Sequence, residues 1–166
     1  MGSDKASSRT KELVLTSIIA ATYSAGTIAI SPISYGPIQA RLTDALIPTS
    51  YNKKIGRAAI MGTTLGCIIA NIISPYGLPD IIIGTLANLL ASISSYTCRN
   101  VSGMRGKLLA TLAPSIIIGL IIGGVLLSYI YGAPLVFTIV TLIAGELISC
   151  VGIGAPLLEA LERILS

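Results

Sequence analysis

Three hydrogen-bonding side chains lie close together in one polar segment of an otherwise apolar chain. Gln39, Arg41 and Asp44 fall within six positions of one another in the stretch 32–48. Their side chains offer both donors and acceptors. In a chain rich in apolar residues, such a segment is a candidate binding site, because polar groups in lipid are costly and usually functional.

Other polar side chains occur singly inside the apolar stretches. Glu146 lies deep in the last of them, where a buried charge costs about 2.5–3.5 kcal/mol on insertion scales. The candidate ligand-binding residues are Tyr35, Gln39, Arg41, Asn71, Asp80, Asn88 and Glu146. Amide and carboxylate groups together with a tyrosine ring for stacking suit a small, flat, polar heterocycle.

Arg41, Asp44 and Asp80 also have structural interpretations. Arg41 and Asp44 are three positions apart, so they could pair on one face of a helix. Asp80 stands at the expected start of a helix, where a carboxylate can satisfy free N–H groups and favour the helix dipole. Neither role excludes contact with a ligand.

The remaining candidates could instead join helices. Asn71 and Asn88 could hydrogen-bond across neighbouring helices, as amides do inside membrane bundles. Glu146 could bond to a helix neighbour such as Thr141 or Ser149. Alternatively, it could accept hydrogen bonds from a ligand.

The elements that must position these residues are transmembrane helices. The chain has 166 residues, 53% hydrophobic and only 11% charged, with a mean hydropathy of +0.86, whereas soluble domains carry about 25% charged residues. The apolar runs lack the alternation of barrel strands, so helices are expected. Five runs are long enough to span a bilayer: 13–30, 55–73, 79–96, 108–128 and 134–153. The composition therefore predicts a multi-pass protein of the cell membrane.

The basic residues indicate a sixth crossing. They form four groups that the positive-inside rule places in the cytoplasm: Lys5, Arg9 and Lys11; Lys53, Lys54 and Arg57; Arg99, Arg105 and Lys107; and Arg163. Only one apolar run separates the first two groups, so both can be cytoplasmic only if residues 36–50 also cross the membrane. As a helix, this segment would cover about 22 Å. We therefore expect an all-α, six-transmembrane-helix bundle with both termini cytoplasmic, a single integral membrane domain over 1–166, and a cytoplasmic helical tail over 155–165.

Small residues recur at four-residue intervals on three expected helices, where they let helix backbones approach closely. For the glycine pairs Gly62/Gly66 and Gly119/Gly123, packing within the bundle is the favoured interpretation. The first helix carries Ala21, Ala25 and Ala29. This alanine face could pack internally or dock another membrane protein.

Several function classes lack their motifs. The sequence has no phosphate-binding loop, no nucleophile elbow and no histidine. Its three cysteines show no metal spacing and are interpreted as small buried hydrophobes. The net charge of +4 belongs to loops between spans and indicates no nucleic-acid partner. No cleavable signal peptide, metal or cofactor is expected. A binding subunit that takes its energy from another protein fits better than an enzyme.

Two stretches resemble a known family. The stretch 32–46, PISYGPIQARLTDAL, is similar to the first-loop signature of the QueT family, and 66–80, GCIIANIISPYGLPD, continuing to GTLA at 84–87, is similar to its second signature. The QueT family comprises queuosine-precursor S components of energy-coupling-factor (ECF) transporters, the vitamin-uptake ABC importers. The resemblance covers roughly 13–153.

The resemblance implies a mechanism. An S component would bind a 7-deazaguanine such as preQ1 or preQ0 from outside. It would then dock through the small-residue face of its first helix, here Ala21, Ala25 and Ala29, onto a transmembrane coupling subunit driven by two ATPase subunits. Rotation in the membrane would release the ligand inside.

Three alternatives stay open from the sequence. The chain could be an S component for another vitamin or heterocycle. It could be a structural or interaction protein of the membrane with no small ligand. It could also be a proton-coupled carrier built around Glu146, although no duplicated half supports that class.

Overall fold

The chain folds into a bundle of helices. A computed structural model describes residues 2–36, 39–101 and 103–165, and within these ranges there is no β-strand. The seven α-helices described are α1 (Gly2–Ala29), α2 (Ser31–Ser34), α3 (Gly56–Asn71), α4 (Gly77–Cys98), α5 (Met104–Ile118), α6 (Leu135–Glu146) and α7 (Gly154–Leu165). A 3-10 helix, η1 (Leu42–Tyr51), and two segments with π-helical hydrogen bonding, η2 (Gly119–Ile130) and η3 (Leu147–Ile153), complete the fold.

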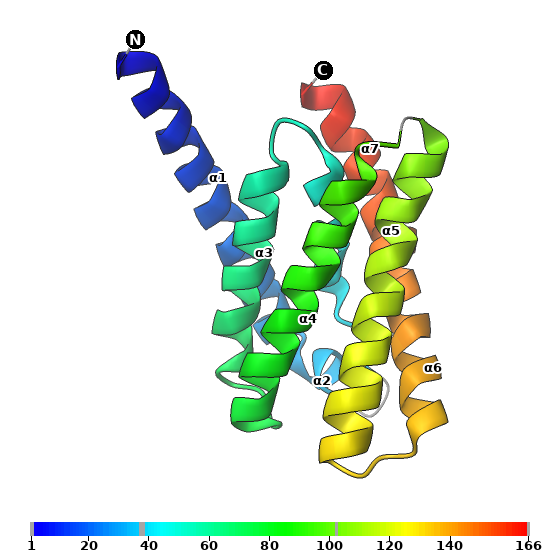
Figure 1. Ribbon diagram of the computed structural model, residues 1–166. Helices are drawn as coiled ribbons and strands as arrows, with labels where there is room; N and C mark the ends of the chain where they lie inside the picture. The colour runs from blue at the N-terminus through cyan, green and yellow to red at the C-terminus, as the bar shows by residue number, and fades with distance from the viewer. Residues whose placement is uncertain (1, 37–38, 102, 166) are drawn as a thin grey trace.

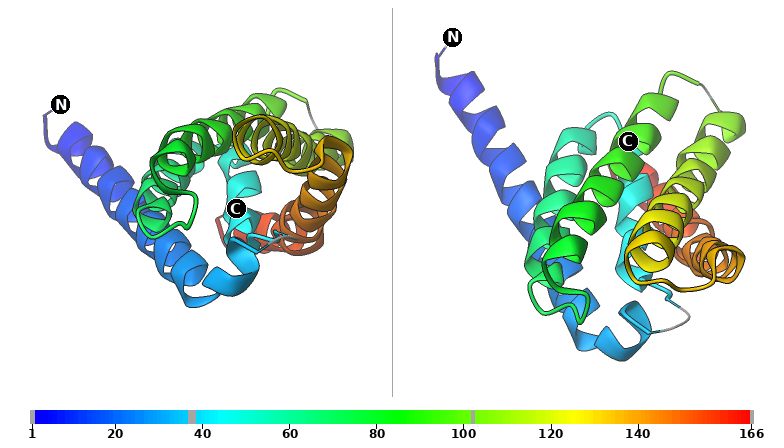
Figure 2. Two further views of the ribbon diagram at one scale, coloured as in Figure 1. Left: turned by 90° about the horizontal axis from the view of Figure 1, so that it is seen from below. Right: turned by 60° about the horizontal axis from the view of Figure 1, so that its bottom comes forward.

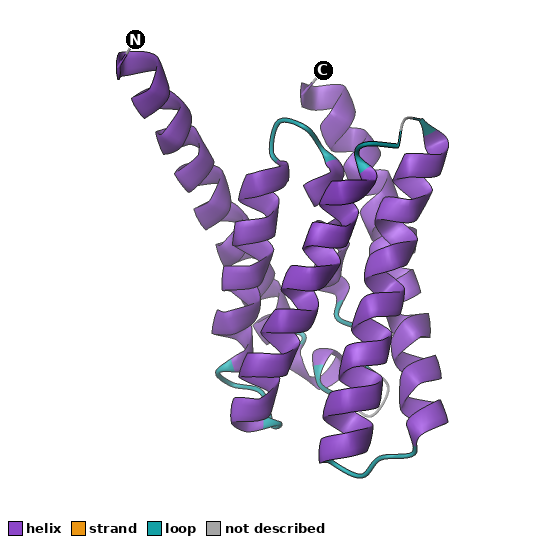
Figure 3. Ribbon diagram, viewed as in Figure 1, coloured by secondary structure: helices purple, strands orange, loops and turns teal. Residues whose placement is uncertain are grey.

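Successive segments run back and forth along the bundle, joined by short loops (Figures 1 and 3). The helix α1 leads away from the N-terminus, η1 returns, and α3, α4, the continuous α5–η2 and the continuous α6–η3–α7 follow. The N-terminus and the C-terminus therefore lie at the same end, which we call the terminal end (Figure 1). The other end, where α2 lies, is called the distal end.

The segment η1 is the centre of the fold. It contacts α1, α3, α4, α5, α7 and η3, and seen along the bundle it lies inside the ring of longer helices (Figure 2). Its buried side chains are Asp44, Ala45, Ile47, Pro48, Thr49, Ser50 and Tyr51. A short polar segment can occupy this place because the surrounding helices, and not lipid, cover its backbone.

The prediction of an α-helix over 36–50 is wrong, because the helical part of this segment is a 3-10 helix. Residues 37 and 38 lie outside the described residues, residues 39–41 are not helical, and Leu42–Tyr51 is a 3-10 helix with Pro48 inside it. Proline cannot donate the backbone bond that an α-helix interior requires. A 3-10 helix also rises about 2.0 Å per residue against 1.5 Å for an α-helix, so ten residues cover about 20 Å.

The membrane-spanning character is supported for the long helices. Among the described residues, four helices are long and apolar enough to cross a bilayer: Ser8–Ala29, Gly77–Cys98, Met104–Ile130 and Leu135–Leu165. The expected count of six helices differs from the seven α-helices described. In particular, the expected tail over 155–165 continues the last span without a break, because α6, η3 and α7 form one helical rod.

The glycine pairs pack within the bundle, as expected. A Cβ at Gly66 would lie 2.7 Å from the Cβ of Tyr23, and a Cβ at Gly123 would lie 2.9 Å from the Cα of Ile139. These glycines bring α3 against α1 and η2 against α6. The prediction of internal packing is confirmed for both seams.

Candidate ligand-binding site

The site is built around Asp44 on the central 3-10 helix. The Tyr23 hydroxyl on α1 donates to Asp44 Oδ1. The Asn88 amide on α4 donates to the Tyr23 oxygen at 3.0 Å and to Asp44 Oδ1 at 3.4 Å. All three side chains are buried. Three elements are therefore joined through one carboxylate in the interior.

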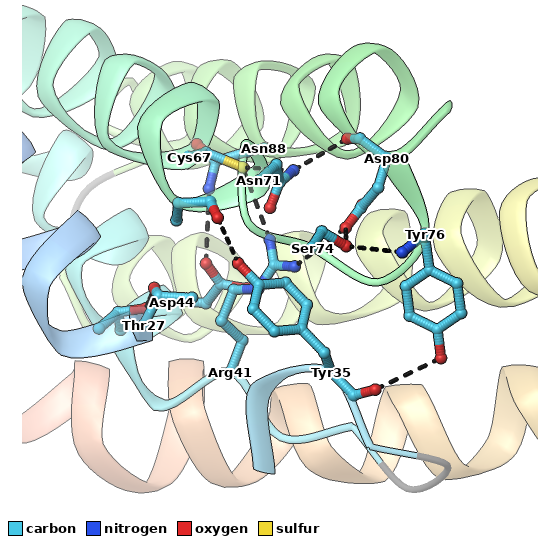
Figure 4. A network of polar contacts seen from close by, with 12 residues as sticks. Thr27, Tyr35, Arg41, Asp44, Cys67, Asn71, Ser74, Tyr76, Asp80 and Asn88 are labelled. Carbon is cyan, nitrogen blue, oxygen red and sulfur yellow. Dashed lines mark hydrogen bonds and ion pairs between the residues drawn. The ribbon is translucent and has the colours of Figure 1, made fainter. Parts of the chain in front are cut away.

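Arg41 connects this centre to a second polar group. Its Nη2 lies 3.9 Å from Asp80 Oδ2, its Nη1 donates to the Cys67 sulfur at 3.5 Å, and its guanidinium lies 5.2 Å from the ring centroid of Tyr35 (Figure 4). The expected pairing of Arg41 with Asp44 on one helix face is not formed, because Arg41 precedes the first residue of η1. Arg41 pairs with Asp80 of α4 instead.

Asp80 and Asn71 fix the junction between α3 and α4 (Figure 4). Ser74 Oγ donates to Asp80 Oδ2 at 2.5 Å and accepts from the Tyr76 N–H at 3.2 Å. Asn71 Nδ2 donates to the Asp80 carbonyl at 2.9 Å. Asp80 lies in the first turn of α4, but α4 has no side-chain bond at its N-cap. Asp80 therefore does not cap α4 directly, as the capping role predicted. It is connected to the Tyr76 N–H through Ser74 Oγ.

Glu146 lies where α6 passes into η3, on the other side of Asp44. Its carboxyl group is in hydrogen-bonding contact with that of Asp44. The Cys150 thiol donates to Glu146 Oε2 at 3.7 Å and to the Asp44 carbonyl at 3.4 Å. Thr141 and Ser149, the helix neighbours considered as partners, donate to backbone carbonyls of their own helix.

A small cavity lies between these groups. It holds about 310 Å³ of space between atoms, but only about 10 Å³ admits the centre of a water molecule. Its lining residues are Gln39, Arg41, Asp44, Gly84, Ala87, Asn88, Ile118, Ile122, Leu142 and Glu146. The lining of the cavity thus combines polar and apolar side chains, which we call its polar wall and its apolar wall. Entry of a heterocycle requires the walls to move apart.

Three buried oxygen atoms in this region accept no hydrogen bond from the described residues. They are Asn71 Oδ1, Asp80 Oδ1 and Asn88 Oδ1. An unpaired buried acceptor costs about 1–3 kcal/mol, so native structures usually satisfy such atoms. All three are acceptors. The unmet need in the site is therefore for a partner that donates hydrogen bonds.

Tyrosines close the distal end of the site. Tyr35 is buried and its hydroxyl donates to the Ala70 carbonyl at 2.8 Å. The Tyr76 hydroxyl donates to the Tyr35 carbonyl at 3.4 Å (Figure 4). The rings of Tyr76 and Tyr131 pack edge to face with centroids 5.3 Å apart. These contacts hold α2, the α3–α4 loop and the loop after η2 together.

The structure brings most of the sequence candidates together. Gln39, Arg41, Asn88 and Glu146 line the cavity. Tyr35 and Asp80 do not line it but contact Arg41, and Asn71 contacts Asp80 (Figure 4). Asn71 and Asn88 join helices through their amide nitrogens, as the structural interpretation expected, yet their oxygens remain unpaired.

Several residues of the network, including Asp44 at its centre, are not in the list of candidate ligand-binding residues. Ser74 lies in an expected loop and Tyr23 in an apolar span, so neither position predicts a role in binding. The interpretation of Cys67 and Cys150 as small buried hydrophobes is confirmed for burial only, since both sulfurs contact polar partners. For Tyr23, the one signal in the sequence is a large aromatic side chain among the mostly small residues 20–29.

The alanine face of α1 points away from this site. Ala21, Ala25 and Ala29 are all exposed, whereas Tyr23 and Thr27 of the same helix are buried. In the described ranges, no group of three or more histidine, cysteine or acidic residues could hold a metal ion.

Comparison with known proteins gives two findings. The sequence model of the QueT transporter family matches residues 13–163. The chain is also 40% identical over 86 residues to the Queuosine precursor transporter QueT of Lactococcus lactis subsp. cremoris (strain MG1363). That alignment covers 50% of this chain and 48% of the relative, so the chain spans about half the length of the relative it matches. No solved structure matches.

Proposed function

Since the chain belongs to the QueT transporter family, we propose that it is the substrate-binding S component of an ECF-type importer for a queuosine precursor. The cargo would be a 7-deazaguanine such as preQ1 or preQ0. The protein would bind it from outside through the distal end of the bundle, with both termini in the cytoplasm. No ATPase motif is present in the sequence, so energy would come from partner subunits.

The unpaired acceptors carry this proposal. Asn71 Oδ1, Asp80 Oδ1 and Asn88 Oδ1 lack donors, and the Watson–Crick edge of a guanine-like ring presents N–H donors. The apolar wall of Ile118, Ile122 and Leu142 could cover one face of such a ring. A ligand that supplies donors and a flat apolar face would match both walls.

The charge balance favours a cation. Arg41 is the single basic side chain in the network, against the carboxyl groups of Asp44, Asp80 and Glu146. Even when Asp44 and Glu146 share one proton, one positive charge faces two negative charges. The ammonium group of preQ1 would offset the excess, whereas the nitrile of preQ0 would not. We therefore expect preQ1 to bind more tightly than preQ0.

Titration calorimetry on the purified full chain tests the proposal. We expect saturable heat with preQ1, and Asn88→Ala should weaken binding about tenfold or more, because it removes a buried acceptor of the ligand. Asn100→Ala, at an exposed loop position, is the matched control and should leave affinity unchanged. Absence of heat with preQ1 and preQ0, and of any competition by guanine analogues, would overturn the proposed cargo.

The same titration separates the alternatives. Binding of riboflavin, thiamine or biotin in place of the deazaguanines would indicate an S component for another heterocycle. If Asn88→Ala lowers only the stability and no ligand binds, a structural membrane protein is indicated. Transport in liposomes without ATP would favour a proton-coupled carrier that uses Glu146.

The exposed alanine face supports docking to a coupling subunit. Ala21, Ala25 and Ala29 leave a shallow strip on α1, against which another helix could pack closely. Ala25→Leu should therefore weaken co-purification with the coupling subunit about tenfold, while preQ1 affinity stays the same. Thr97→Leu, at an exposed position of α4, is the control. Equal co-purification of both variants would contradict a docking role for this face.

A further inference from the structure

A second, larger cleft lies at the terminal end of the bundle, far from the polar network. It has a volume of about 860 Å³ and lies between the first half of α1, the start of α3 and the end of α4. The first half of α1 diverges from the other helices there (Figure 1). The residues on the α1 side are Ser8, Lys11, Glu12 and Leu15.

The cleft is strongly basic. Among the described residues that line it, the cations are Lys11, Lys53, Lys54, Arg57 and Arg99, against the one carboxylate of Glu12. Lys54 donates to the Leu165 carbonyl at the end of α7. In the described part of the chain, the other four cations form no salt bridge. The positive charges of these four cations are therefore available to an anionic ligand.

Tyr96 organises the two arginines. The Arg99 guanidinium lies 3.6 Å from the centroid of the Tyr96 ring, and Arg57 is in hydrogen-bonding contact with the Tyr96 side chain. Two guanidinium groups are therefore held at one phenol ring. Paired guanidinium groups suit phosphate oxygens, because each can donate two parallel hydrogen bonds.

The lining of the cleft also includes apolar side chains, which we call its apolar base. They are Leu15, Ile55 and Ala58; Ile55 and Ala58 are buried, whereas Leu13 and Val14 of the adjacent α1 turn are exposed. Tyrosine and arginine at the edge of an apolar surface are typical of the headgroup level of a bilayer. A soluble phosphate would use the charges but not the apolar base.

From these features we propose that the cleft binds the headgroup of an anionic phospholipid. The phosphate lies between Arg57 and Arg99, Lys11 and Lys53 offset the remaining negative charge, and the acyl chains run along the apolar base toward α3. On α1 the cleft uses residues 8–15, which precede Ala21, the first residue of the alanine face, by more than one helical turn. A lipid bound there leaves the alanine face free, and the site is independent of the proposed cargo.

Native mass spectrometry of the full chain in nonionic detergent tests this site. Phosphatidylglycerol and phosphatidylcholine with the same acyl chains are titrated separately. We expect phosphatidylglycerol to bind at least about tenfold more tightly. Arg57→Gln and Arg99→Gln should each weaken its binding about fivefold, as removal of one cation near an anionic headgroup does.

Arg105→Gln is the matched control, because Arg105 is an exposed arginine outside the cleft; it should change binding less than about twofold. Lys53→Gln, on the loop before α3, gives a second variant if an arginine variant unfolds. Unfolding temperatures in phosphatidylcholine should be the same for all variants that are compared.

Three results would overturn the site. The first is equal binding of the two lipids. The second is equal loss of phosphatidylglycerol binding in Arg105→Gln and Arg57→Gln, which would indicate general charge attraction. The third is displacement of phosphatidylglycerol by millimolar inorganic phosphate, which would indicate a site for a free anion.

Discussion

The two ion pairs among the described residues lie at opposite ends of the bundle and differ in burial. Arg41 and Asp80 lie 3.9 Å apart, with side chains only 10% and 2% exposed. Lys107 and Glu162 lie 2.6 Å apart, with side chains 28% and 30% exposed. The shorter pair is the weaker one, because water screens it. Burial, and not distance, decides what each pair contributes.

The buried pair should show the largest effect. Arg41→Met leaves Asp80 charged without its partner, which typically costs about 3–5 kcal/mol of unfolding free energy. Combining it with Asp80→Leu should restore part of that stability, because Asp80 no longer remains as a buried charge without a partner. Denaturant unfolding in detergent measures both variants.

The double variant also separates stability from binding. If Arg41 or Asp80 contacts the ligand, the restored protein still fails to bind preQ1 in calorimetry. Recovery of both stability and affinity would instead assign the pair a purely structural role. In that case, the difference between the buried pair and the exposed pair would be a difference in folding stability and not in ligand binding.

The close packing of η2 against α6 at the distal end, where the buried pair lies, can be tested at two neighbouring glycines. A Cβ at Gly123 would lie 2.9 Å from the Ile139 Cα, whereas a Cβ at Gly124 would meet nothing closer than 3.8 Å. Gly123→Ala should therefore cost about 1–3 kcal/mol, as overpacking does. Gly124→Ala is the control and should be neutral. Equal unfolding temperatures of the two variants would show that η2 and α6 can move apart enough to accommodate the added methyl group.

The exposed pair should show the smallest effect. Lys107→Gln removes the contact with Glu162 on α7, and exposed pairs contribute about 0–1 kcal/mol. The small loss of stability should disappear at high salt. An effect as large as that of Arg41→Met would refute the contrast between the two ends.

The sequence predicted the all-α class of the fold, and most of its candidate site residues lie close together in the structure. From the basic loops we predicted a sixth crossing near Asp44. The structure shows this segment running back between the other helices (Figure 2), and its crossing of the membrane stays a prediction. Sequence could not predict its 3-10 geometry, which depends on the helices packed around it. The pairing of Arg41 with Asp80 joins residues far apart in the chain, so no local spacing could indicate it.

Local spacing was also the reason for the missed residues. Tyr23 joins the network through Asp44, twenty-one positions away, and through Asn88, sixty-five positions away. Cys150 contacts Asp44 across an even longer stretch of chain. Neither belongs to a motif. Each acquires its role from the helices that bring it to the central segment.

The central position of η1 imposes an order on biosynthesis. Residues 42–51 leave the ribosome early, yet they pack against η3 and α7, which are made last. A 3-10 segment with a buried aspartate cannot remain stable while facing lipid. It must therefore stay in a protected, hydrated place, such as the insertion machinery, until the final helix arrives. Chains truncated before Leu147 should accordingly be degraded and not accumulate in the membrane as partial bundles.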